Sequence, residues 1–288
     1  MHPGSSSDSL LPSRQQEQQL SGSPARSTDL RYTYFRQMLH TARRNFTAHR
    51  LCEAPDVLPN TGSPLLFLRH DIKMSLHKAL RMAEIEHEYG MPATYMVRSD
   101  SLLYSLTGRQ ARILLLELVQ MGHEVGLHFD LAHETRQSSS FLRLVEAEIQ
   151  TACERIEQII CRPVRSLSFQ RSLPLLFDGP LLINGRVNAD GQELRAWCIS
   201  ESGGHWRDGE PLPQLKRPTG PALQLILHPI WWGDERMIAP QRLQEFFDFA
   251  TREKSSGEAS IFDINLAKTL PAVRRQGIHA LLSGGEEV

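Results

Sequence analysis

The chain has 288 residues, 40% of them hydrophobic, which is enough to fill the core of one large domain. Its 32 basic side chains nearly balance 33 acidic ones. This balance argues against nucleic acid or an anionic membrane as a partner, because both attract strongly basic surfaces.

Both ends of the chain are expected to lie outside the folded unit. Residues 1–28 are rich in serine, glutamine, glycine and proline, too polar to offset the entropy lost on ordering, and predict a disordered tail. Residues 283–288 predict a second tail, which leaves residues 29–282 as one domain. We see neither a signal peptide nor a membrane span. The four cysteines show no Cys-x-x-Cys spacing, so we expect reduced thiols and a cytoplasmic protein.

Helical patterns and short apolar runs alternate along the chain. Asp29 is a candidate N-cap of a first helix that reaches about His49. A second helix is predicted from Ser75 to a left-handed cap at Gly90. Further helices are expected over residues 107–121 and 141–160, and strands over residues 64–68, 93–97, 123–128, 165–169, 196–199, 223–227 and 261–264.

This alternation favours parallel strands joined by right-handed crossovers. The chain has no Gly-x-Gly-x-x-Gly after its first strand and no linker between two domains. We therefore predict an α/β fold, a distorted (β/α) barrel of seven or eight parallel strands. Residues 172–194 are irregular and leave the strand count and the closure of the barrel open.

Several predicted strands end in the same way, with apolar residues followed by a polar cluster, as in FLRHD, GLHFD, LSFQR, CISES and LILHP. In a parallel barrel the carboxyl ends of the strands open on one face. We therefore expect a shared site containing Asp71, His128, Arg171, Glu201 and His228. Taken singly, each has a structural interpretation, such as a loop histidine or a neutralising arginine. Together they indicate acid/base or metal chemistry.

One metal motif fails on its spacing. A zincin helix needs its second histidine four residues after the first, so that both imidazoles share one helical face. Here His128 lies one residue too far from His123, in a segment that resembles a strand. We instead predict that His123 is a structural hydrogen-bonding residue and that Glu124 is solvated.

The ordered runs LRHDIKMSLHKALRMAEIEHEYGMPATYMVRSDSLLYSL, GHEVGLHFDLAH, SLSFQR, ISESGGHWRDG and LILHPIWWG resemble the polysaccharide deacetylase, or NodB-homology, family. The resemblance is to bacterial members with an Arg-His-Asp first motif, and it covers about residues 65–233. It implies a distorted (β/α) barrel that hydrolyses the N-acetyl group of an amino sugar with a divalent metal, zinc being the expected ion. It also implies work in surface-polysaccharide pathways.

The resemblance assigns roles to individual residues. Asp71 matches the catalytic base that takes a proton from the attacking water, and His228 matches the acid that protonates the leaving amine. His128 matches the first metal-binding histidine, and Arg171 matches the arginine that orients the base. The expected substrate-binding residues are Arg69, His70, Glu201, Trp231 and Trp232, the two tryptophans presenting aromatic faces to a sugar ring.

The chain departs from the family pattern at three places. Ile72 and Lys73 stand where a second acidic residue would bind the metal. The second metal-binding histidine is expected at Ala132, and His133 lies one residue late. Gln170 replaces the histidine of the usual His-Arg-Pro cluster.

These departures leave two interpretations open. If Lys73 points into solvent, His128, His133 and Asp130 could still hold a weak metal. If Lys73 enters the pocket, its ammonium can pair with Asp71 and occupy the space of the cation. The chain would then be a catalytically impaired, metal-free sugar-binding pseudoenzyme on the same barrel.

Overall fold

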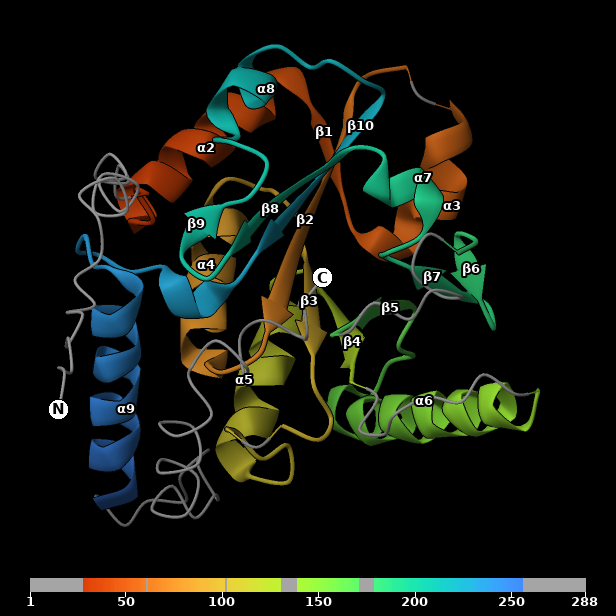
Figure 1. Cartoon of the computed structure of the whole chain (residues 1–288), viewed down its shortest axis with the longest axis vertical. Coiled ribbons are helices and arrows are strands. Elements are labelled where there is room, and N and C mark those ends of the chain that lie inside the picture. The colour runs from red at the N-terminus through yellow and green to blue at the C-terminus, as the bar shows by residue number, and fades with distance from the viewer. Residues whose placement is uncertain (1–27, 61, 102, 131–138, 171–178, 256–288) are drawn as a thin grey trace, which may run out of the picture.

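The computed structural model describes residues 28–60, 62–101, 103–130, 139–170 and 179–255 (Figure 1). The predicted strand over residues 261–264 and the predicted tails, except for Thr28, lie outside these ranges. Within them, no helix is long and apolar enough to cross a bilayer.

A curled sheet of ten strands forms the centre of the molecule (Figure 1). Nine of its strands follow the order β6-β7-β5-β4-β3-β2-β10-β8-β9, and β1 pairs with β2 off this path. All pairings between β7 and β8 along the path are parallel. Antiparallel hairpins, β6 with β7 and β8 with β9, close the two edges. Among the described residues β7 and β8 do not pair with each other, so the barrel is open on one side. The predicted distorted (β/α) barrel is confirmed.

The strands are short, as expected for buried parallel strands. Their bounds are β1 (Thr47–His49), β2 (Leu65–Ile72), β3 (Thr94–Val97), β4 (Glu124–Phe129), β5 (Ser166–Phe169), β6 (Leu182–Ile183), β7 (Arg186–Asn188), β8 (Cys198–Ser202), β9 (His205–Trp206) and β10 (Ala222–Leu227). The stretch that looked irregular in the sequence thus contains β6 and β7.

Helices surround this sheet (Figure 1). Their bounds are α2 (Tyr32–Asn45), α3 (Ala54–Val57), α4 (Leu76–Glu88), α5 (Arg109–Gln120), α6 (Ser139–Ile160), α7 (Gln192–Arg195), α8 (Leu212–Lys216) and α9 (Ala239–Ser255). The predicted ends of α4 are confirmed, because Ser75 Oγ accepts a hydrogen bond from the Lys78 amide at 3.2 Å and Gly90 has a φ of +66°.

The prediction for the first helix was wrong at both ends. Helix α2 ends at Asn45, and Thr47–His49 turns into β1, which pairs with the start of β2. Pairing with β2 satisfies the backbone of this segment better than a further helical turn could. At the other end Arg31 is the N-cap residue, and Asp29 accepts a hydrogen bond from the Arg31 amide rather than from the helix.

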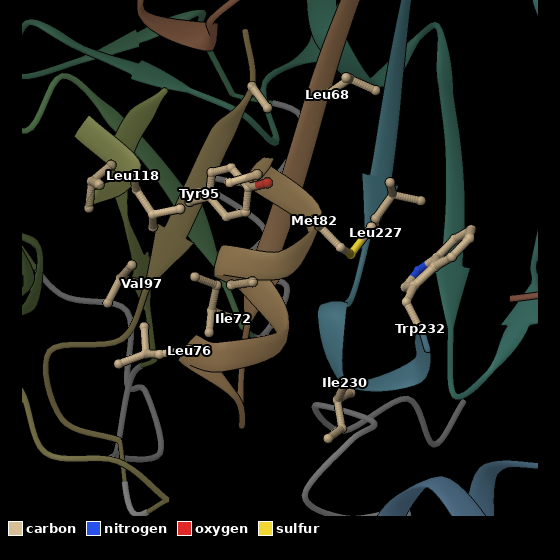
Figure 2. Packing of buried hydrophobic residues seen from close by; sticks show 14 of the residues in the cluster. Leu68, Ile72, Leu76, Met82, Tyr95, Val97, Leu118, Leu227, Ile230 and Trp232 are labelled. Carbon is tan, nitrogen blue, oxygen red and sulfur yellow. The ribbon is translucent and has the colours of Figure 1, made fainter. Parts of the chain in front are cut away.

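Strand β2 is buried along its whole length and sends its side chains to two different cores. Leu68 and Ile72 belong to the large cluster between the sheet and the helices (Figure 2). Leu65 and Phe67 belong to a smaller cluster inside the curl of the sheet. Because successive residues of a strand point to opposite faces, the inner face continues with Arg69 and the residues that alternate with it.

Candidate functional site

The inner face of β2 carries a buried cluster of charges at its carboxyl end. Arg69 donates from Nε to Asp71 Oδ1 at 2.8 Å and from Nη2 to Asp71 Oδ2 at 3.0 Å. Its Nη1 donates to Asp190 Oδ1 at 2.7 Å, and Asp190 Oδ2 accepts from the Phe169 amide at 2.8 Å. Burial alone would raise the pKa of Asp71, but the charge of Arg69 and its hydrogen bonds hold it well below its usual value. Asp71 is therefore a fixed, ionised carboxylate.

His128 approaches this carboxylate from β4. Its Nδ1 lies 4.0 Å from Asp71 Oδ2. The same Nδ1 lies 2.8 Å from Ser168 Oγ, and Nε2 lies 2.7 Å from Gln170 Oε1. Burial lowers the pKa of His128 to about 4, so the ring is neutral at pH 7. With Gln170 Oε1 as the acceptor, Nε2 carries the proton and Nδ1 accepts from the Ser168 hydroxyl.

His228 and Glu201 complete the group from the other side of β2. His228 Nδ1 donates to the Glu201 carbonyl oxygen at 2.5 Å, and the His228 amide donates to Glu201 Oε2 at 3.0 Å. Burial lowers the pKa of His228 to about 3 and raises the pKa of Glu201 to about 8. Because Nδ1 is the donor, Nε2 is the acceptor nitrogen of the ring.

The register of the sheet places Asp71 beside His228. Strand β10 is the parallel neighbour of β2, and the last pair in their register joins Leu227 to His70. Asp71 is the next residue after His70, and His228 is the next residue after Leu227, so the backbones of Asp71 and His228 lie side by side. Each side chain is buried at the same end of the sheet.

Lys73 follows Asp71 by two residues and lies just beyond the end of β2 at Ile72. It is half-buried, and burial lowers its pKa. Its positive charge also lowers the pKa of His228 and of His128. Lys73 is therefore partly withdrawn from solvent, and its charge acts on both histidines of the candidate site.

The metal ion that the resemblance implies does not fit these residues. Ile72 is buried in the large core, and Lys73 brings a cation to the place of a ligand. Both ring nitrogens of His128 already bond to Ser168 and Gln170. The ammonium would repel a dication by roughly several kcal/mol. Across the described residues there is no group of three or more His, Cys, Asp and Glu that could hold a metal ion. His133 and Ala132 lie outside the described residues.

Other predicted site residues lie elsewhere. His70 faces α4, where its Nε2 lies 2.6 Å from Glu86 Oε1 and its ring stacks on Tyr95 with a centroid distance of 4.4 Å. It is fully buried, so its predicted contact with substrate is wrong. Arg171 lies outside the described residues, and Arg69 orients Asp71 in this structure.

The two tryptophans are core residues. Trp231 is 3% exposed and Trp232 is 0% exposed, so neither presents a face to a sugar ring. The Trp232 ring packs against Phe35 and Trp206, with centroid distances of 5.3 and 6.2 Å. The prediction of an aromatic sugar platform is therefore corrected to a packing role (Figure 2).

The prediction for Glu124 is also corrected. Instead of being solvated, it is buried and accepts hydrogen bonds from Thr94 Oγ1 at 2.8 Å, Ser166 Oγ at 2.6 Å and the Cys52 amide at 3.0 Å. The structural role predicted for His123 is confirmed, because its ring accepts from the Ala93 amide and donates to the Ala83 carbonyl.

Asp190 is the functional neighbour that the sequence did not indicate. It lies just after β7, in the stretch without a recognisable pattern, and reaches Arg69 across 121 positions of sequence. A lone aspartate after Asn188 and Ala189 carries no signal that could have identified this contact.

A cavity of about 380 Å³ opens beside His128. This volume is within the range of small-molecule sites, about 300–1,000 Å³. Its walls come from the ends of β3 and β4 and from α6, and they include the polar side chains of Asp100, Asp130, Thr151 and Arg155.

The chain matches no protein-family model and no curated protein. Among solved structures it is similar to a CE4 family pseudoenzyme from Bacillus anthracis, with 16% identity, a TM-score of 0.38 and coverage of 69% of this chain and 63% of that one. It is also similar to a Streptococcus pyogenes deacetylase in complex with acetate (15%, 0.38, 73% and 84%). A third is a family 4 acetyl xylan esterase from Clostridium thermocellum with a cobalt ion (16%, 0.38, 67% and 85%). The match thus spans less than two thirds of the pseudoenzyme.

Proposed function

We propose that this chain is a polysaccharide deacetylase-like protein whose site takes an acetylated amino sugar of a saccharide. The observation that carries the proposal is the register of β2 and β10, which sets Asp71 and His228 side by side at the carboxyl ends of the strands. A buried carboxylate and a buried imidazole at the carboxyl end of the sheet are the groups that an amide hydrolase needs. The ordered motifs that resemble the deacetylase family support the same substrate.

In removal of the acetyl group, Asp71 would act on the attacking water and His228 on the leaving nitrogen. Asp71 would accept a proton from water as its oxygen attacks the acetyl carbonyl, and His228 would give a proton to the nitrogen as the carbon–nitrogen bond breaks. Acetate and a free amine would result. The pKa of His228, lowered to about 3 by burial, leaves too little imidazolium for this role at pH 7, and Arg69 makes Asp71 a weak base.

A second function, metal-free saccharide binding without turnover, has its own supporting observation. Lys73 and the bonded nitrogens of His128 leave no fit for the ion that would stabilise the oxyanion. The carboxyl, imidazole and ammonium groups at this end of the sheet nevertheless offer donors and acceptors for sugar hydroxyls and an amide. The cytoplasmic location and the place in surface-polysaccharide metabolism stay predictions.

Acetate release and saccharide binding, measured on the same protein, test the proposal. N-acetylglucosamine oligosaccharides serve as the probe, with Asp71→Asn as the variant and Asp56→Asn, at an exposed aspartate of α3, as its matched control. Acetate release that is lost only in Asp71→Asn would establish the hydrolase. Binding without acetate release, altered only in Asp71→Asn, would establish the binding protein. A wild type that neither binds nor hydrolyses any acetylated saccharide would contradict the proposal.

A further inference from the structure

We propose that a cavity between α4 and α9 is a second ligand site, which takes a small organic anion with an aromatic or other apolar body. None of its lining residues belongs to the group around Asp71, so this site goes beyond the proposed function. The lining of the cavity, the hydrogen bonds of one of its cations and the balance of charge around it support this assignment.

The cavity has a volume of about 270 Å³. Sites for small molecules span about 300–1,000 Å³, so its ligand belongs at the small end of that range. Helices α4 and α9 both pack against the short helix η3 (Pro229–Trp231), and the cavity opens between side chains of the two long helices (Figure 1). Its lining combines three cationic side chains, Lys78, Arg81 and Arg252, with the rings of Tyr32, Phe246 and Phe249.

Lys78 is held in place by two hydrogen bonds. Its Nζ donates to the Trp232 carbonyl oxygen at 2.9 Å and to Glu245 Oε2 at 2.8 Å. The side chain is 17% exposed. An ammonium carries three N–H donors, so these two bonds fix its position and leave one donor for a ligand. Lys78 is therefore a preorganised cation in the wall of the cavity.

The one carboxylate in the lining does not cancel this charge. Glu245 is shared between two cations, because Arg242 Nη1 also donates to its Oε2, at 2.9 Å. The charge of Asp234 acts on Lys78 as well, but it does so more weakly than Glu245. The carboxylates near Lys78 are thus balanced by Lys78 and Arg242, and the other two cations of the lining remain as excess positive charge.

Those two cations are the arginines at the rim. Arg81 pairs with Glu84 at 2.7 Å, but both side chains are nearly half exposed, where such a pair is weak. Arg252 is exposed and forms no ion pair within the part of the chain that the structure describes. A guanidinium has five N–H donors and binds carboxylate or phosphate oxygens readily. An anion entering the cavity would therefore meet cations from both helices.

The aromatic part of the lining decides what kind of anion fits. Phe246 is 2% exposed, and the ring of Phe249 packs edge-on against His77 with a centroid distance of 5.1 Å. Such walls gain free energy by covering apolar surface of a ligand. A bare inorganic ion leaves them unused. We therefore expect a carboxylate or phosphate group joined to a ring or a similar apolar body.

Calorimetric titration of the full chain with three probes tests this specificity. Phenyl phosphate carries a ring and an anion, inorganic phosphate carries the anion alone, and benzylamine carries a ring and a cation. Phenyl phosphate should bind, inorganic phosphate should bind roughly tenfold more weakly, and benzylamine should not bind. Added salt should weaken the binding of phenyl phosphate, because exposed charges are screened.

Substitutions locate the bound probe. Arg252→Gln and Lys78→Gln each remove one positive charge and should weaken phenyl phosphate binding roughly tenfold, the effect of one lost charge-assisted hydrogen bond. Lys216→Gln, at an exposed lysine of α8, is the matched control and should bind like the wild type. Thermal melting shows whether each variant is folded. If Lys78→Gln unfolds because its bonds within the protein are lost, the exposed Arg252 still provides the test.

Asp71→Asn separates the two sites, because it should leave the binding of phenyl phosphate unchanged. The inference is overturned if phenyl phosphate does not bind, if benzylamine binds equally well, or if Arg252→Gln binds as tightly as Lys216→Gln. Binding that changes in Asp71→Asn but not in Arg252→Gln would place the probe at the other site and would also overturn it. None of these outcomes depends on an acetylated saccharide, so the proposed function stands or fails separately.

Discussion

Replacement of Arg69 by methionine removes a guanidinium that bonds to two buried carboxylates. Asp71 and Asp190 are each 5% exposed, and methionine fills much of the space of the arginine stem without its charge. Removing one partner of a buried ion pair costs about 3–5 kcal/mol of folding stability, because the charge that is left has no compensation. We expect Arg69→Met to lose at least that much at neutral pH.

The cost should depend on pH with a definite sign. In the wild type the pKa of Asp71 is held below its unfolded value, mainly by Arg69 acting against burial. Its stabilising contribution is therefore present at neutral pH and is lost only as pH falls through that low folded pKa. Without Arg69, burial would raise the pKa of Asp71 above its unfolded value of about 3.9. The variant then takes up a proton on folding in mild acid, so the difference from wild type should shrink between pH 8 and pH 5.

Urea unfolding at pH 8 and pH 5 measures this difference. Arg81→Met is the matched control, because Arg81 forms an exposed ion pair with Glu84 on α4, with side chains 46% and 45% exposed. Such surface pairs contribute about 0–1 kcal/mol. An Arg69→Met protein that loses no more stability than Arg81→Met at pH 8, or whose loss stays the same at pH 5, would refute the reasoning.

Two further predictions concern the core and the pH profile. Trp232→Ala should cost about 3–5 kcal/mol in denaturant unfolding, while the partly exposed Trp197→Ala should cost about 1 kcal/mol or less; a Trp232→Ala protein of wild-type stability would contradict the packing role. Because burial raises the pKa of Glu201 to about 8, the wild-type melting temperature should fall between pH 6.5 and pH 8. His128 and His228 have lowered pKa values and act only below about pH 6.5, so Glu201→Gln alone should flatten this slope. Equal slopes would show that Glu201 is not the group responsible.

Local signals predicted the regular elements well. The side-chain cap of Ser75 and the glycine at position 90 mark the ends of α4 in sequence and in structure. The predicted end of the first helix was wrong because the first residues of β2 pair with Thr47–His49. Pairing with a strand farther along the chain cannot be read from helical periodicity.

The polar residues at the strand ends predicted where the site lies, but they did not predict which side chains point into it. The repeated pattern indicated correctly that Asp71, His128, Glu201 and His228 share one end of the sheet. Strand β2 is buried on both faces, so no polar alternation shows which residues point inward. For that reason His70 was assigned to the pocket, although it bonds to Glu86 behind the sheet.

The Arg-His-Asp motif at the end of β2 and the lysine that follows it supply both positive and negative charge to this end of the sheet. Arg69 and Asp71 succeed one another on the inner face of β2, and Lys73 follows just beyond its end, so the carboxylate lies between two cations in the sequence. A dication added here would face two positive charges and one carboxylate that already bonds to a guanidinium. Exchanging Lys73 for aspartate reverses the sign of the net charge on this strand end, whereas adding a histidine elsewhere in the site would leave the repulsion in place. Metal affinity in this protein should therefore be governed by position 73 before any other residue.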